Sequence, residues 1–439
     1  MLINVNFKKK FIFSNHNCYT QRLLYYISKI KIMNMKSTIF FILSLLVFVS
    51  CIKENETKEI INFKCSDNQK VCDLSKDNCD FGLEIFKKMS IEDIEGNLFI
   101  SPFSISSALS MTMNGAKQET KDQMINTLKY TDWNIDSLNA AYRDFLKLLP
   151  LLDQEVIMKN ANSIWCRKGY PVLDDFLRIN SDNYNAEIQT RDFSKSETLT
   201  EINNWVENKT EGKIKDILDQ IPADAFMYLI NAIYFKGTWM YEFDKKNTYD
   251  SNFKLENGNN VTVKMMNELE LPVSTFYNEK FQAIDIPYGD SIYSMTILLP
   301  NQYFKVNDII NSLNIDTWQE VINGFYPNTM NVSIPKFKLE YKNELSDILG
   351  SLGMPVAFTD MADFSGINGT GGLYISRVIH QSYVEVDETG TEAAAATVVE
   401  VNLTSAGNNY FNANKPFVFV IRENKTNSIL FIGKLMDPS

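Results

Sequence analysis

The fold is decided by the stretch Glu388-Thr-Gly-Thr-Glu-Ala-Ala-Ala-Ala-Thr-Val-Val-Glu-Val-Asn-Leu-Thr-Ser405. Its four consecutive alanines favour a helix, but Gly390 precedes them and β-branched residues follow, so neither a helix nor an ordinary loop fits the whole. Read with a period of two, the stretch has one face of small and then apolar side chains and a second face with most of the polar ones.

This alternation is typical of a strand that buries a small-residue face. That face consists of Thr391, Ala393, Ala395, Thr397, Val399, Val401 and Leu403. The other face consists of Glu392, Ala394, Ala396, Val398, Glu400 and Asn402. Ala406-Gly-Asn-Asn409, which follows, indicates an exposed loop. A surface helix followed by an edge strand is the alternative interpretation.

Further motifs accompany this stretch in a fixed order along the chain. They are Asn97-Leu-Phe-Ile-Ser-Pro-Phe-Ser-Ile-Ser-Ser-Ala-Leu109, Gly115-Ala-Lys117, Ala161-Asn-Ser-Ile-Trp165, Asn231-Ala-Ile-Tyr-Phe-Lys-Gly-Thr-Trp239, Ile334-Pro-Lys-Phe-Lys338, Ala362-Asp-Phe-Ser-Gly366, Val378-Ile-His380 and Lys415-Pro-Phe-Val-Phe419. Together they resemble the serpins, a family of suicide-substrate proteinase inhibitors, over residues 79–439. The resemblance implies an α+β fold with three β-sheets, eight or nine helices and an exposed reactive-centre loop at about residues 388–411.

The resemblance also implies a mechanism. In serpins a protease attacks the exposed loop and forms an acyl-enzyme, and the cleaved loop then inserts as a new central strand into the main sheet. We therefore expect an inhibitor of serine endopeptidases, with cysteine endopeptidases as second targets, that is not itself an enzyme. A non-inhibitory serpin that acts as a binding or chaperone-like surface protein is the alternative. Bulky or charged residues in the hinge mark many such members, and this hinge has none on its inward face.

Site residues follow from matching the family motifs position by position. The hinge comprises Glu388, Gly390, Thr391, Glu392, Ala393, Ala394, Ala395, Ala396 and Thr397. The shutter, which lies beneath the strands that open, comprises Ser101, Ser104, Asn231 and His380. The breach, at the top of the opening, comprises Trp239 and an ion pair between Lys336 and Glu388. Helix capping near Pro102 is a second role that Ser101 and Ser104 could serve.

The family's spacing from the hinge predicts where the loop is cut. Counting from Glu388 places Thr404 on the acyl side of the reactive bond and Ser405 on the leaving side, with Leu403 as the alternative acyl residue. Thr404 is small and uncharged, so it suits elastase- or subtilisin-like proteases, whereas the acidic pocket of a trypsin-like enzyme would stay unpaired. Leu403 would serve a chymotrypsin-like enzyme if the cut fell one residue earlier, and it also suits papain-like proteases, which read the side chain before the acyl residue.

Composition excludes several other functions. The 439 residues carry a net charge of −11; residues 1–50 hold seven Lys or Arg and no acidic residue, so the remainder has 36 basic and 54 acidic residues. A body of net charge −18 should not attract nucleic acid, and it would reach a membrane only through a lipid anchor. With two histidines in the chain, no metal or other cofactor is expected. The sequence lacks the phosphate-binding loop motif Gly-x-x-x-x-Gly-Lys-Ser/Thr, the zinc-protease motif His-Glu-x-x-His and the nucleophile-elbow motif Gly-x-Ser-x-Gly of hydrolases.

Periodicity predicts helices early in the chain and strands late, without a linker or repeat, and hence one α+β domain. We expect this domain to be a monomer. The expected helices are 81–89, 104–114, 117–128, 135–149 and 199–218. The expected strands are 227–235, 294–299, 332–341 with a bulge at Pro335, 374–386, 417–422 and 429–435. His380 falls inside an apolar run, where a satisfied core histidine is the ordinary interpretation.

The N-terminal region is typical of an export signal. Residues 37–52 carry no charge and are too short to span a membrane but long enough for the apolar region of a signal peptide. The run ends in Phe48-Val-Ser-Cys51, which resembles the lipobox of bacterial lipoproteins, so we expect an exported prokaryotic lipoprotein lipidated at Cys51. A plain signal peptide is the alternative. We interpret residues 1–32 as a doubtful extension, 33–51 as the signal and 52–78 as a polar leader.

The leader contains Cys65, Cys72 and Cys79 at equal spacing. Because the context is extracellular and no histidine lies nearby, a disulfide between two of them is more plausible than a zinc site. Cys166 lies beside Trp165 in an apolar strand-like run and is expected to be a buried structural thiol.

Overall fold

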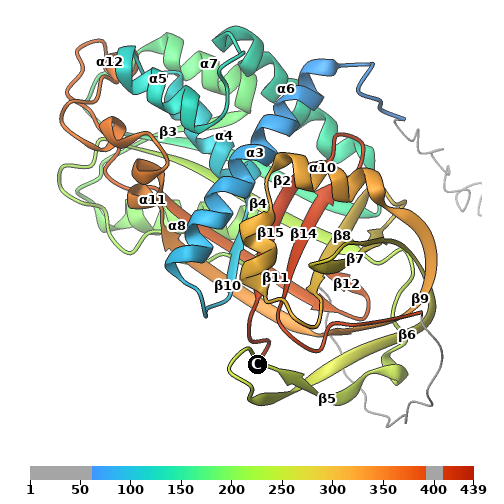
Figure 1. Cartoon of the computed structure of the whole chain (residues 1–439). Helices are drawn as coiled ribbons and strands as arrows, with labels where there is room; N and C mark the ends of the chain where they lie inside the picture. Colours follow the sequence, from blue (N-terminus) through green and yellow to red (C-terminus); the bar gives the residue numbers. More distant parts are fainter. Residues whose placement is uncertain (1–61, 392–408) are drawn as a thin grey trace, which may run out of the picture. The chain divides into compact units, whose positions relative to one another are not determined.

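Helices dominate the first half of the described chain and strands the second, as the periodicities predict (Figure 1). The computed structural model describes residues 62–391 and 409–439, which belong to one compact unit, Ile60–Ser439. The described residues form ten α-helices: α3 Gln69–Glu92, α4 Pro102–Met113, α5 Gln118–Thr127, α6 Ile135–Leu152, α7 Asp174–Tyr184, α8 Ser196–Lys209, α9 Val306–Ser312, α10 Ile315–Gly324, α11 Ser346–Ser351 and α12 Ser365–Asn368. Their strands are β1 Leu98–Ile100, β2 Val156–Arg167, β3 Ala186–Arg191, β4 Met227–Thr238, β5 Tyr249–Lys254, β6 Asn260–Tyr277, β7 Phe281–Tyr288, β8 Tyr293–Pro300, β9 Tyr326–Pro335, β10 Phe337–Glu344, β11 Ile379–Asp387, β12 Gly390–Thr391, β13 Tyr410–Asn412, β14 Phe417–Glu423 and β15 Ser428–Leu435.

One sheet has six strands in the order β10-β11-β12-β4-β2-β3. Both β11 and β4 run antiparallel to β12, so they are parallel to each other. Strand β12 consists of Gly390 and Thr391 alone. Along the rest of β11, from the level of Thr391 back to His380, no strand of the described chain lies between β11 and β4. The sheet therefore has a place for one more central strand.

The other sheet has nine strands, in the order β1-β15-β14-β8-β7-β6-β9-β13 with β5 paired to β6. The long strand β6 pairs with β5 through its first residues and with β7 through its last, and its register against β9 shifts between Glu268 and Leu271. Eight or nine helices were expected, and the described chain has ten, because α11 and α12 are short helices of six and four residues. Three sheets were expected. Because this irregular strand joins two groups of strands, hydrogen bonding unites them, and the described residues form two sheets within the expected α+β class.

Three predicted elements differ from the structure for identifiable reasons. The strand expected over 374–386 begins at Ile379, because its partner β10 ends opposite it at Glu344. The helix expected over 199–218 ends at Lys209, because Glu211 and Gly212 adopt positive φ angles of 52° and 78°, which a helix cannot continue through. The strand expected over 332–341 is two strands, not one with a bulge. β9 ends at Pro335 and β10 begins at Phe337 in the other sheet.

The amino end of the unit also differs from the expectation. Helix α3 begins at Gln69, well inside the predicted leader, because Val71, Leu74 and Ser75 are buried. The predicted disulfide exists and joins Cys65 to Cys72. Cys79 is a free buried thiol whose pKa burial raises to about 12, and Cys166 is buried and free as predicted.

Among the helices that the structure describes, none is both long and apolar enough to cross a bilayer. The expected signal and lipidation site, including Cys51, lie outside the described residues.

Candidate functional site

Thr391 occupies the top of the opening between β4 and β11. Its backbone pairs with Val386 of β11 on one side and with Gly237 of β4 on the other. The side chain is 3% exposed, and its Oγ1 lies 2.6 Å from the hydroxyl oxygen of Tyr288 in β7. The residue predicted to lead the hinge on its buried face is thus already seated between the two strands.

Gly390 is required by the close approach of the chain to β4. Its φ angle is +150°, and a Cβ atom placed there would come within 2.0 Å of the carbonyl oxygen of Gly237. Any side chain at this position would push the chain away from β4. A glycine therefore lets the chain turn tightly into the sheet just before Thr391.

The predicted breach ion pair forms. Glu388 Oε2 lies 2.8 Å from Lys336 Nζ, and Thr248 Oγ1 donates to Glu388 Oε1 at 2.8 Å. Burial acts to raise the pKa of the Glu388 carboxyl, but the hydrogen bonds from Lys336 and Thr248 outweigh it and hold that pKa below its ordinary value. The start of the hinge is therefore anchored by a charged residue that stays ionised.

Trp239 closes the same end of the opening. Its Nε1–H donates to the Asp387 carbonyl oxygen at 2.9 Å, and its backbone N–H donates to the carbonyl oxygen of Thr389. The indole ring stacks on the ring of Tyr288 with centroids 4.3 Å apart. Trp239, Lys336 and Glu388 thus meet around the turn that leads from β11 into β12, as the resemblance implied.

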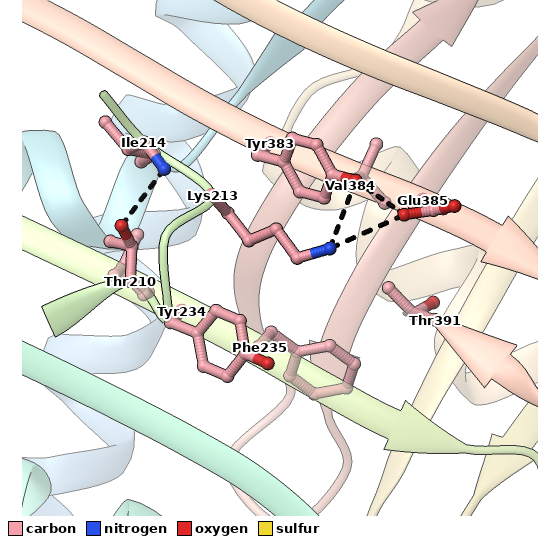
Figure 2. A pocket seen from close by; sticks show the side chains of 10 residues that line it. Thr210, Lys213, Ile214, Tyr234, Phe235, Tyr383, Val384, Glu385 and Thr391 are labelled. Carbon is pink, nitrogen blue, oxygen red and sulfur yellow. Dashed lines mark hydrogen bonds and ion pairs between the residues drawn. The ribbon is translucent and has the colours of Figure 1, made fainter. Parts of the chain in front are cut away.

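A pocket lies beside Thr391, between β4 and β11 (Figure 2). Its walls are Ile233, Tyr234, Phe235, Tyr383, Val384, Glu385 and Thr391 of the sheet together with Thr210, Lys213 and Ile214 from the segment after α8. Figure 2 shows Lys213 reaching toward Tyr383 and Glu385, with its Nζ 3.6 Å from the Glu385 carboxylate. The pocket marks where the two strands are not hydrogen-bonded to each other.

The predicted shutter residues Ser101 and His380 are in direct contact. The backbone N–H of Ser101 donates to His380 Nε2 at 3.1 Å, and the Ser101 hydroxyl donates to the carbonyl oxygen of Leu430 at 2.7 Å. Burial lowers the pKa of the His380 imidazole to about 4, so the ring is neutral and can accept this bond. His380 is a satisfied core histidine that ties β11 to the start of α4.

The other two shutter residues are placed differently. Ser104 donates its backbone N–H to Ser101 Oγ at 3.2 Å, so Ser101 is also the N-cap of α4. Asn231 lies in β4, across the gap, and donates to the side chains of Asn160 and Asn162 in β2. The four residues therefore sit on both sides of the gap, with His380 on β11 and Asn231 on β4.

The predicted loop lies between two anchored ends. Thr391 ends the first described part of the chain in the six-stranded sheet, and Tyr410 begins β13, which pairs in parallel with β9 in the nine-stranded sheet. The remaining predicted site residues lie outside the described chain: Glu392, Ala393, Ala394, Ala395, Ala396, Thr397, Leu403, Thr404 and Ser405.

Sequence reasoning missed Tyr288, Thr248 and Lys213. Each makes its contact through tertiary structure alone: Tyr288 with Thr391, Thr248 with Glu388 and Lys213 with Glu385. No periodicity or motif in the printed sequence indicates these partners. Within residues 62–391 and 409–439, no group of histidine, cysteine or acidic side chains could hold a metal ion.

Comparison with known proteins gives a consistent result. A family model described as "Serpin (serine protease inhibitor)" matches residues 76–438. The chain is 37% identical to Serpin B11 of Homo sapiens, over 83% of this chain and 99% of that protein. It is 36% identical to the leukocyte elastase inhibitor of Xenopus tropicalis, over 82% of this chain and 97% of that protein.

Solved structures agree. The native state of tengpin, a thermophilic serpin, superposes with a TM-score of 0.74 at 36% identity, over 83% of this chain and 94% of tengpin. A complex of thyroxine-binding globulin with thyroxine superposes with a TM-score of 0.77 at 26% identity, over 84% of this chain and all of that chain.

Proposed function

This chain belongs to the serpin family, and we propose that it is an inhibitory member, a suicide-substrate inhibitor of serine endopeptidases. A protease cleaves the reactive-centre loop, and the loop then inserts between β4 and β11 while the acyl-enzyme is still intact. The observation that supports this proposal most is the position of Thr391. It is already paired with both strands and buried between them.

The pairing of Thr391 predicts the register of the inserted strand. If the antiparallel pairing continues, each later residue faces one residue further back in β11 and in β4. Thr397 then comes to lie between His380 and Asn231, the two shutter residues on opposite sides of the gap. The hinge and the shutter would thus become neighbours in one continuous sheet.

Side-chain size in the loop suits this insertion. Residues that share the face of Thr391 point toward the core between the two sheets, where the Thr391 hydroxyl contacts Tyr288. Ala393 and Ala395 share that face by sequence, so they would add little volume to a close-packed interior. Insertion would then proceed quickly enough to compete with hydrolysis of the acyl-enzyme.

We propose that the target proteases are elastase- or subtilisin-like, with papain-like enzymes second and trypsin-like enzymes disfavoured. The reactive bond joins Thr404 to Ser405, with Leu403 as the alternative acyl residue. Trypsin has no preferred bond in the loop, because no Lys or Arg occurs between Arg377 and Lys415. The similarity to relatives named leukocyte elastase inhibitor supports the elastase-like assignment.

The proposal is tested by incubating the protein with pancreatic elastase, subtilisin, papain and trypsin. We expect a covalent complex with elastase or subtilisin that survives denaturing electrophoresis. Under the same denaturing conditions a C-terminal fragment that begins at Ser405 should separate from it and be identified by mass spectrometry. Cleavage of the loop without any complex would contradict an inhibitory function. Rapid stoichiometric trapping of trypsin, with cleavage inside the loop, would contradict the target assignment.

We further propose that the protein acts as an exported monomer, anchored to the outer surface of a prokaryotic membrane by lipid on Cys51. Phe48-Val-Ser-Cys51 supports this, and stable anchoring needs more than one acyl chain. Metabolic labelling with a radioactive fatty acid should mark the wild-type chain and fail to mark Cys51→Ala. Membrane retention of the unlabelled Cys51→Ala protein would contradict a lipid anchor.

A further inference from the structure

The segment after α8, residues 210–219, makes contacts on both sides of the gap between β4 and β11; we call it the bridging segment. Ile214, Ile217 and Leu218 belong to one buried apolar cluster with Ile230 of β4, against which Tyr383 of β11 also packs. The bridging segment therefore covers the face of the six-stranded sheet that carries Tyr383 and Glu385.

On the β2 and β3 side, ion pairs hold both α8 and the start of the bridging segment. Glu211 pairs with Lys159 of β2. Just before it, Lys209 Nζ lies 2.5 Å from the Glu187 carboxylate in β3. Trp205 Nε1 donates to the same carboxylate at 2.8 Å, so this end is fixed to the half of the sheet that contains β4.

On the other side, charged and polar contacts reach β11 and β10. Lys213 Nζ lies 3.6 Å from the Glu385 carboxylate, 3.4 Å from the Tyr383 hydroxyl and 4.8 Å from the centre of the Tyr383 ring. Further along, Gln381 of β11 donates to the backbone oxygen of Lys215. Lys342 of β10 contacts the backbone oxygen of Asp216 at 2.9 Å and the Asp219 carboxylate at 3.1 Å.

These contacts tie the two halves of the sheet together across the place where a strand would insert. We propose that the bridging segment is an ionic latch on this gap, and that Lys213 is the positioning residue that limits how fast a strand inserts between β4 and β11. The inference rests on the proposed inhibitory function, because it concerns the step that this function requires.

The latch is suited to release. The side chains of Lys213 and Glu385 are 26% and 33% exposed, so their attraction is partly screened by water and weakens with salt. Separation of β4 from β11 must lengthen the contacts of the bridging segment on one side or the other. Removal of the Lys213 charge should therefore speed insertion by about fivefold, the scale of one partly exposed ion pair.

Insertion can be measured without a protease. The full-length protein is mixed with a fluorescent synthetic peptide of residues 391–403, and peptide uptake is followed by fluorescence anisotropy. Lys213→Met removes the charge and keeps an unbranched side chain. Lys215→Met is the matched control, because Lys215 lies in the same segment but its side chain pairs with Glu207 on α8, on the near side of the gap.

We expect Lys213→Met to take up the peptide about fivefold faster than wild type. Lys215→Met should take it up at the wild-type rate, and so should Lys213→Arg, which keeps the positive charge. Glu385→Gln removes the charged partner of Lys213 on β11, so it should also accelerate peptide uptake. Added salt should speed wild type more than Lys213→Met, in which the Lys342–Asp219 pair still reaches across the gap.

Two outcomes distinguish failure of the latch proposal from failure of the inhibitory proposal on which it rests. Equal uptake rates for Lys213→Met, Lys215→Met and wild type at every salt concentration would overturn the latch and leave the inhibitory proposal standing. Failure of every variant to take up the peptide, together with absence of protease complexes, would overturn both.

Discussion

The hydroxyl oxygens of Tyr288 and Thr391 lie 2.6 Å apart, in a buried contact between β7 of the nine-stranded sheet and β12 of the six-stranded sheet. One hydrogen bond thus holds the first inward residue of the hinge against the opposite layer. Tyr288 also stacks on Trp239, so the breach and the hinge share one aromatic side chain.

Tyr288→Phe should loosen the hinge while keeping this ring stack. The Thr391 hydroxyl would lose its partner in a buried place, and we expect the free energy of unfolding to fall by about 1–2 kcal/mol in urea titrations. In a Thr391→Val background the same change should have almost no effect. If Tyr288→Phe lowers the free energy of unfolding just as much in Thr391→Val, the Tyr288 hydroxyl acts through contacts other than the one with Thr391.

Thr391→Arg should convert the inhibitor into a substrate. Thr391 is already buried between β4 and β11, so an arginine at this position should move out into solvent in the intact protein. It must then be desolvated before the strand can insert, at a cost of several kcal/mol without a partner. Gel electrophoresis with elastase should then show cleaved protein in place of covalent complex. Thr391→Ser, which keeps a small side chain and a hydroxyl, should still form complex; complex formation by Thr391→Arg at the wild-type level would refute this account of the hinge.

Lys336→Met should destabilise the breach. It leaves the carboxylate of Glu388 buried with Thr248 as its remaining side-chain partner, and we expect a loss of about 1–3 kcal/mol, since Lys336 itself is partly exposed. Because the folded pKa of Glu388 is lowered, its stabilising effect is present at neutral pH and disappears as the pH falls through that pKa.

The difference between Lys336→Met and wild type should therefore shrink in acid. The control is Lys338→Met, since Lys338 pairs with Glu340 on the exposed face of β10 and should change stability little. If Lys336→Met and Lys338→Met lower the free energy of unfolding equally, the Lys336–Glu388 pair stabilises the protein no more than an exposed pair does.

His380 should make the native state sensitive to acid. Its pKa is lowered from 6.5 to about 4, so the unfolded chain binds a proton more readily than the folded one between these values. Stability is then complete above pH 6.5 and falls by about 3 kcal/mol as the pH drops to 4. His380→Gln, whose amide oxygen takes the position of Nε2 and can accept from the Ser101 N–H, should show a shallower decline in thermal unfolding; an identical pH dependence would contradict this role.

Much of the site could be predicted because serpin motifs are local in sequence. The resemblance to the serpins implied the hinge, Trp239 and the Lys336–Glu388 pair, and the structure brings the described start of the hinge together with Trp239 and Lys336. Cys166, buried in β2, was found from its apolar surroundings alone.

What could not be predicted depends on tertiary contacts. The alternation over 332–341 indicates extended backbone, but it does not reveal that the chain leaves one sheet and enters another at Lys336, because both strands share the same period. Likewise, nothing local marks Gln69 as a helix start. The buried contacts of Val71 and Leu74 decide it.

The cleaved loop should become a strand between β4 and β11, and thermal unfolding of loop-cleaved protein tests this insertion most directly. The C-terminal fragment should remain bound after cleavage, because β14 and β15 are buried throughout. Insertion adds a fully paired central strand, so the unfolding temperature should rise by at least about 10 °C in the cleaved wild type and stay unchanged in cleaved Thr391→Arg. An unfolding temperature that is equal or lower after cleavage of the wild type would contradict insertion.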